Sequence, residues 1–182
     1  EFFNLDDGTP SRHVRSYPDL KKYENEIALF GIRVQANQLT EHEAKTLDNS
    51  LTSIRNAAIS AKDVKDILHN IDELRSSASD ELFGFYQSIT HCQKEFYNNV
   101  EEAFQLHGSD RQESLVRLKT IAADVHRLAA QDVYRLFSNK DHQDISVPSL
   151  LNLVRAINNS NESLLRAIEP ELEMPSDRRN GN

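Results

Sequence analysis

The chain has 182 residues, a net charge of −8 at pH 7 and one cysteine. This length suits one compact domain, and the negative charge argues against nucleic-acid binding, because basic surfaces bind phosphates. A lone cysteine forms no disulfide within the chain, which favours a reducing compartment. The longest apolar run, Ile27 to Ile32, is far shorter than the roughly 20 residues that span a bilayer, and the first residues do not form a signal peptide. We therefore expect the sequence as given to be soluble.

The first 16 residues carry Gly8, Pro10 and a basic cluster without apolar periodicity, so we expect a linker or arm there. Pro18 then occupies a position typical of the first turn of a helix. The apolar residues that follow predict an amphipathic helix up to about Asn37, with a stripe at helical spacing: Leu20, Tyr23, Ile27, Phe30 and Val34.

The second predicted helix begins after Thr40. The sequence Thr40-Glu41-His42-Glu43 is a capping box, in which the side chains of Thr40 and Glu43 each accept a free backbone N–H. No glycine or proline interrupts the apolar stripe that runs from Leu47 to Leu74. The pattern predicts one helix of about 35 residues, or roughly 50 Å, in an elongated bundle.

Three more helices are predicted from their start and stop signals. The first covers residues 82–106 and is closed by Gly108, the second opens at Ser109 and runs to Leu136, and the third opens at Ser146-Val147-Pro148 and ends near Pro170. Residues 171–182 are polar and are expected to form a disordered tail. The fold prediction is all-α: an elongated antiparallel bundle of about five helices over residues 17–170.

The sequence offers little support for catalysis. It contains no glycine-rich phosphate loop and no nucleophile motif, and its seven histidines show no paired metal-ligand spacing. Cys92 lies between Ile89 and Phe96 on an apolar stripe, which indicates a buried structural thiol. We expect no catalytic residue, no cofactor and no enzymatic activity.

A polar group on the last predicted helix is the main candidate site. Asn158 and Asn161 stand at stripe positions, and Glu162 follows directly. Buried asparagine is unfavourable unless it finds partners. Three interpretations remain open: these residues specify the register of the bundle, bind a ligand, or mark a poorly buried middle of the helix.

Two parts of the chain match when they are set 100 residues apart. Residues 53–67 aligned on 153–167 place Arg55 on Arg155 and Ser60 on Ser160, and the apolar residues stay in step. The helices that precede these segments also align, with these pairs: Leu20 with Leu118, Tyr23 with Ile121, Ile27 with Val125, and Phe30 with Leu128. The matches suggest a duplicated helix pair.

This order of a short helix and a long helix, then repeated, resembles the PhoU family of helical phosphate-regulation proteins. The resemblance rests on the lines "LDNSLTSIRNAAISAKDVKDILHNIDEL" and "LLNLVRAINNSNESLLRAI" and covers about residues 18–170. More specifically, the chain resembles the PhoU-like cytoplasmic domain that follows the membrane region of bacterial sodium/phosphate cotransporters. The six-helix plan of the family implies that the second repeat is truncated here.

The metal motif of the family is largely absent from this chain. In the family, an arginine on each long helix is followed by two acids that bind metal clusters. The arginine positions correspond to Arg55 and Arg155, but the acid positions correspond to Ala58, Lys62, Asn158 and Glu162. Only Glu162 remains acidic, and alanine and lysine cannot replace two carboxylates around a hard cation. We therefore expect no metal site, with Glu162 as a weak candidate ligand. The possible polar site comprises Arg55, Arg155, Asn158, Asn161 and Glu162.

The resemblance implies a regulatory domain at the cytoplasmic face of the inner membrane. Its partner would be a phosphate-transporting transmembrane region of the same polypeptide, and changes in helix packing would carry the signal. The basic residues near the start of the chain suit a segment next to a membrane. The alternative is a freestanding interaction or signalling bundle, with a homodimer along the second helix as one form of it. A metal-dependent enzyme is the third alternative.

Overall fold

The computed structural model describes residues 17–138 and 146–173. These residues form six helices and no strand: α1 (Tyr17–Gln35), α2 (Glu41–Asp66), α3 (Leu68–Arg75), α4 (Asp80–Gln105), α5 (Gly108–Ser138) and α6 (Val147–Glu173). The predicted all-α class is confirmed. The predicted arm at 1–16 and most of the predicted tail lie outside the described residues.

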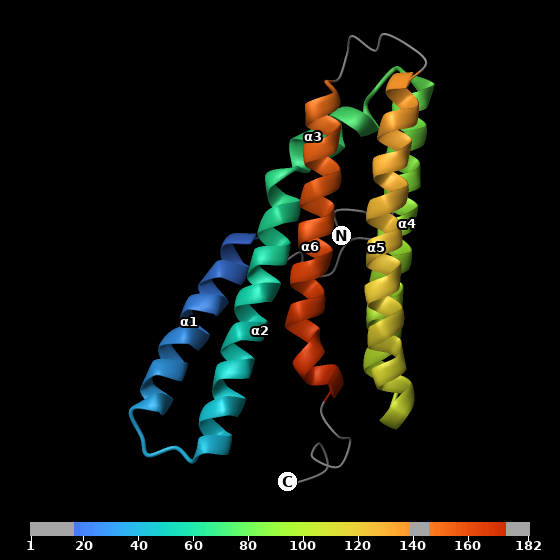
Figure 1. Ribbon diagram of the computed structural model, residues 1–182. Helices are drawn as coiled ribbons and strands as arrows, with labels where there is room; N and C mark the ends of the chain where they lie inside the picture. Colours follow the sequence, from blue (N-terminus) through green and yellow to red (C-terminus); the bar gives the residue numbers. More distant parts are fainter. Residues whose placement is uncertain (1–16, 139–145, 174–182) are drawn as a thin grey trace.

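The additional helix arises because the predicted long second helix is two helices. The chain leaves helical geometry at Ile67, where φ is −107° and ψ is 7°, and resumes as α3. α3 turns over the end of the bundle and packs against α4 and α6 (Figure 1). Neither glycine nor proline marks this break. Its cause is tertiary, because the bend buries Ile67, Ile71 and Leu74 in one core.

Side-chain caps fix most helix starts where the sequence predicted them. The Thr40–Glu43 capping box is formed, and Ser79 caps α4 by accepting the N–H of Leu82. Ser146 accepts the N–H of Ser149 at the start of α6.

Two predicted boundaries are wrong. Gly108 begins α5 instead of ending α4, and its φ of 57° lies in the left-handed region that glycine adopts without strain. α6 continues past Pro170 to Glu173, so residues 171–173 belong to the helix and not to the tail. Because proline has no backbone N–H, α6 lacks the hydrogen bond from position 170 to the carbonyl of Arg166.

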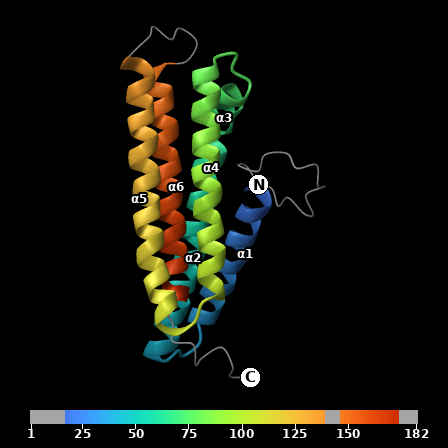
Figure 2. The same cartoon turned by 90° about the vertical axis from the view of Figure 1, so that its right-hand side faces the viewer.

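Apart from α3, which lies across one end, the helices run roughly along one long axis (Figures 1 and 2). α6 lies at the centre and packs against α2 on one side and α5 on the other, while α4 packs against α5. α1 lies on the outside of the bundle, where it packs against α2. Among the helices of the described ranges, none is both long and apolar enough to cross a membrane.

The predicted apolar stripes are buried on α4 and α5 but not on α1. Leu115, Leu118 and Val125 of α5 are buried, whereas Tyr23, Ile27 and Phe30 of α1 are exposed by 45%, 37% and 63%. The single buried residue of α1 is Gly31, which lies close to the side chain of Leu51 on α2. α1 is therefore attached by a narrow contact, and most of its apolar stripe faces outward.

Candidate functional site: a polar layer in the bundle core

The bundle core consists of two apolar clusters that follow one another along the long axis. On α4 the first cluster ends at Ile89 and the second begins at Phe96; on α6 the corresponding residues are Ile157 and Leu165. Tyr97 packs against both clusters. Several of the buried side chains between the clusters are polar, and we call five of them the polar layer: Ser60 of α2, Thr90 and Gln93 of α4, and Ser160 and Asn161 of α6. Val125 of α5, which also belongs to neither cluster, is buried and apolar.

Ser60 and Ser160 join the two halves of the predicted repeat. Their hydroxyl oxygens are 3.0 Å apart, and the Ser160 hydroxyl lies 3.0 Å from the backbone carbonyl oxygen of Ser60. Both contacts are satisfied if Ser160 donates to the carbonyl and Ser60 donates to Ser160. The residues that match in the sequence alignment therefore meet in space, and α2 and α6 are locked to one another at this level.

Tyr97 links the same point to α4. Burial raises the pKa of the Tyr97 phenol, and its side-chain hydrogen bond with Ser160 opposes part of that rise. The phenol therefore stays neutral at physiological pH. The five side chains of the polar layer do not titrate in that range, so the layer and Tyr97 offer structural hydrogen bonds and no general acid or base.

Three members of the layer lack a hydrogen-bond partner within the described part of the protein. They are the Thr90 hydroxyl and the side-chain amides of Gln93 and Asn161, and these residues are 2%, 0% and 1% exposed. A buried polar group without a partner costs about 1–3 kcal/mol. In folded proteins such groups are satisfied by water, by a ligand or by a second packing arrangement. The layer is therefore the least favourable part of the core energetically.

The five sequence-predicted site residues do not converge on one point. Arg55 is exposed, and the exposed Arg155 donates to the side chain of Asn152 over 3.1 Å. Asn158 donates to Glu162 over 2.9 Å, and Arg166 donates to the other Glu162 oxygen over 3.2 Å. Asn161 alone lies in the core. The structure thus separates one buried asparagine from a chain of surface contacts along α6.

The sequence interpretation missed Thr90, Gln93 and Tyr97. The apolar stripe of α4 passes from Ile89 to Phe96, and position 92 or position 93 completes it with equally good helical spacing. We expected the apolar Cys92 to be buried, but it is half-buried and Gln93 takes the core position. The usable signal was a glutamine three residues before Phe96 and four after Ile89, a spacing that fits the apolar stripe.

The described ranges contain no group of side chains arranged to bind a metal ion and no activated thiol. No group of three or more His, Cys, Asp or Glu side chains there has an arrangement that could hold a metal ion. Glu162 is already engaged by Asn158 and Arg166. The pKa of the Cys92 thiol is raised, first by burial and then by the nearby carboxylates of Glu95 and Asp132, so the reactive thiolate is disfavoured.

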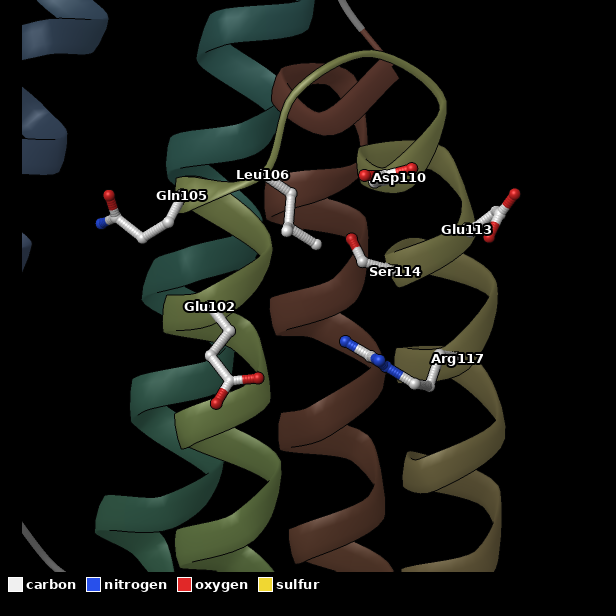
Figure 3. Close-up of a pocket in the computed structure, with 7 residues that line it drawn as sticks. All are labelled: Glu102, Gln105, Leu106, Asp110, Glu113, Ser114 and Arg117. Atoms are coloured by element: carbon white, nitrogen blue, oxygen red, sulfur yellow. The ribbon is translucent and has the colours of Figure 1, made fainter.

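A hollow of about 710 Å³ lies where α4 meets the start of α5. Figure 3 shows Arg117 reaching from α5 toward α4, and Leu106 between the two helices. The remaining lining residues are Glu102, Gln105, Asp110, Glu113 and Ser114. The Ser114 hydroxyl donates to the backbone carbonyl of Arg111 over 2.6 Å, so it is not an available nucleophile. The hollow is wide and solvated, and it offers no combination of nucleophile and base.

Comparisons of the chain with protein-family models, with curated proteins and with solved structures found no match.

Proposed function

We propose that this chain is a non-enzymatic regulatory bundle, joined in its full polypeptide to a membrane region that transports phosphate with sodium. The observation that carries the proposal is the contact of Ser60 with Ser160. Two helix pairs, α1 with α2 and α5 with α6, meet there through residues that match in the sequence. A duplicated pair of this kind is what the resemblance to PhoU-like domains leads us to expect.

The polar layer suggests how such a bundle would respond to a partner. Apolar cores resist sliding because close-packed side chains interlock. A layer with hydrogen bonds that can exchange partners lowers the cost of small shifts between helices. In this proposal α6 shifts relative to α4 at the level of Gln93 and Asn161, while the Ser60–Ser160 contact keeps it in register with α2.

Two experiments test the assignment. The reading frame upstream of Glu1 is expected to encode several apolar spans of about 20 residues, and their absence would contradict the membrane-linked role. In cells that express the full polypeptide, deletion of residues 17–173 is expected to change sodium-driven phosphate uptake at fixed external phosphate. Unchanged uptake at equal expression would contradict the regulatory role.

A freestanding interaction module is the second candidate function. It is favoured by the apolar stripe of α1, which is exposed where a stripe normally faces a core. An upstream sequence without membrane spans, together with a stable complex through α1, would select this alternative.

A further inference from the structure

α1 carries an apolar seam that no other helix of the described ranges covers. The seam comprises Leu20, Tyr23, Ile27, Phe30 and Val34, which are spaced 3, 4, 3 and 4 residues apart as in the contact line of a coiled coil. Leu20 and Val34 are half-buried at the edge of the α2 contact, and the three residues between them are exposed. In Figure 1 the outer side of α1 faces away from the rest of the bundle.

The α5 residues that align with the α1 seam in the sequence repeat are more deeply buried than the seam residues. Val125 is 7% exposed, whereas its counterpart Ile27 is 37% exposed; Leu118 is fully buried, whereas Leu20 is half-buried. α5 packs against both α6 and α4, and α4 runs antiparallel to it before a short turn at Gly108, whereas α1 packs mainly against α2. The seam of α1 is therefore suited to an amphipathic helix that runs antiparallel to it.

Aliphatic and aromatic residues alternate along the seam in the same order in either chain direction. Its order is aliphatic, aromatic, aliphatic, aromatic, aliphatic, with Ile27 at the centre. If two such seams pack antiparallel about Ile27, Leu20 lies level with Val34 of the other copy, and Tyr23 lies one residue out of register with Phe30 of the other copy, close enough for the two rings to pack. Aromatic pairs of this kind contribute about 0.5–1.5 kcal/mol beyond the area that they bury. A twofold axis makes the two helices antiparallel without any further requirement.

We propose that the α1 seam binds the α1 seam of a second copy of this chain, and that the two copies form a twofold dimer centred on Ile27. This inference goes beyond the regulatory function and does not depend on phosphate transport.

The charges of α1 favour a second copy over a strongly charged partner. The helix carries three acidic and three basic residues in a chain whose net charge is −8. Lys21 is paired with Glu24 and Lys22 with Glu26 within the helix. The borders of the seam are therefore close to neutral, and two copies approach without net repulsion at this surface.

The interface is small, and a reversible dimer is expected. α1 has 19 residues and is about 28 Å long, so a single pair of such helices lies at the low end of interface sizes. Sedimentation of the intact chain over a roughly hundredfold concentration range is expected to show a monomer–dimer equilibrium. A wild-type chain that remains monomeric over the whole concentration range would overturn the proposal. The seam would then be a binding surface for a helix of a different protein.

A matched pair of variants locates the interface. Phe30 of α1 and Tyr134 of α5 are both 63% exposed, so lysine at either position is tolerated by the fold. Phe30→Lys is expected to raise the dimer dissociation constant at least about tenfold, and Tyr134→Lys is expected to leave it unchanged. Equal weakening by both variants would overturn the proposal, and thermal unfolding by circular dichroism checks that both are folded.

Crosslinking tests the twofold geometry. In a Cys92→Ser background, which removes the only native cysteine, Ile27→Cys is expected to give a disulfide-linked dimer on mild oxidation, because position 27 lies beside its own symmetry mate. Tyr134→Cys, the control, is expected to stay monomeric under the same conditions. A wild-type dimer without crosslinking at position 27 would overturn the proposed arrangement.

Discussion

Ser60 and Ser160, which are 100 residues apart, meet inside the bundle with their hydroxyl oxygens 3.0 Å apart. Both are buried, at 7% and 1% exposure. They are also the pair of serines that coincide when the two halves of the sequence are aligned. The contact therefore joins equivalent positions of α2 and α6, the second helices of the two matching pairs.

The amide of Gln93 is predicted to weaken the fold. Gln93→Met keeps the length of the side chain and removes a buried amide that has no partner among the described residues. We expect the free energy of unfolding to rise by about 1 kcal/mol, because the desolvation cost of the amide disappears. Urea denaturation measures the change, and Gln87→Met, at an exposed position of the same helix, serves as the control. A loss of stability on Gln93→Met would show that the amide is well satisfied.

Ile67 is predicted to hold the bend between α2 and α3. Its side chain is 6% exposed, whereas Ile59, on α2, is 41% exposed. Ile67→Ala is expected to lower the free energy of unfolding by about 2–4 kcal/mol through a cavity. The same substitution at Ile59 is expected to cost less than about 1 kcal/mol. Equal costs in chemical denaturation would contradict the packing of this bend.

Alanine substitutions at two glycines are predicted to change the stability of the protein in opposite directions. Gly108 has a φ of 57°, so Gly108→Ala is expected to destabilise the protein by about 1–2 kcal/mol. Gly84 lies within α4, and a methyl group added there meets no atom within 4 Å. Gly84→Ala is expected to stabilise the helix by up to about 1 kcal/mol. Thermal melts of the two variants give the comparison, and a shift of the same sign in both would contradict the assigned turn.

The alkaline stability of the protein is predicted to depend on Tyr97. Burial raises the pKa of its phenol in the folded state, so the folded protein holds this proton more tightly than the unfolded chain. The associated stability is fully present below the unfolded pKa of about 10 and is lost as pH rises through the folded pKa. Tyr97→Phe is expected to reduce the fall of stability above about pH 10. Tyr134→Phe, at an exposed position, is expected to keep the wild-type slope in urea denaturation across this range.

Helix starts and two of the core stripes were predictable from the sequence because their causes are local. Thr40, Ser79 and Ser146 cap the helices that follow them, and the stripes of α4 and α5 are largely buried. The break at Ile67 was not predictable, since it follows from the packing of α3 on α4 and α6. The outward orientation of the α1 stripe was not predictable either, because the stripe has the same spacing as one that faces a core.

The candidate site was only partly predictable. Asn161 was identified as a polar residue at a core position, and the structure buries it. Glu162 is exposed, because adjacent positions point about 100° apart around a helix. Asn158 is half-buried, and its side chain donates to Glu162 instead of joining Asn161 in the core. Gln93 escaped notice because Cys92 completed the stripe of α4 equally well. Only the positions of the neighbouring helices decide which of two adjacent residues faces the core.

The most direct test of the account is a double-mutant cycle on Ser60→Ala and Ser160→Ala, measured by chemical denaturation. The account predicts a coupling free energy of about 0.5–1.5 kcal/mol, because each single variant removes the same buried hydrogen bond. Ser60→Ala combined with Ser163→Ala, at another buried serine of α6, is expected to be additive. Additivity in the Ser60–Ser160 cycle itself would contradict the claim that this contact joins the two helix pairs.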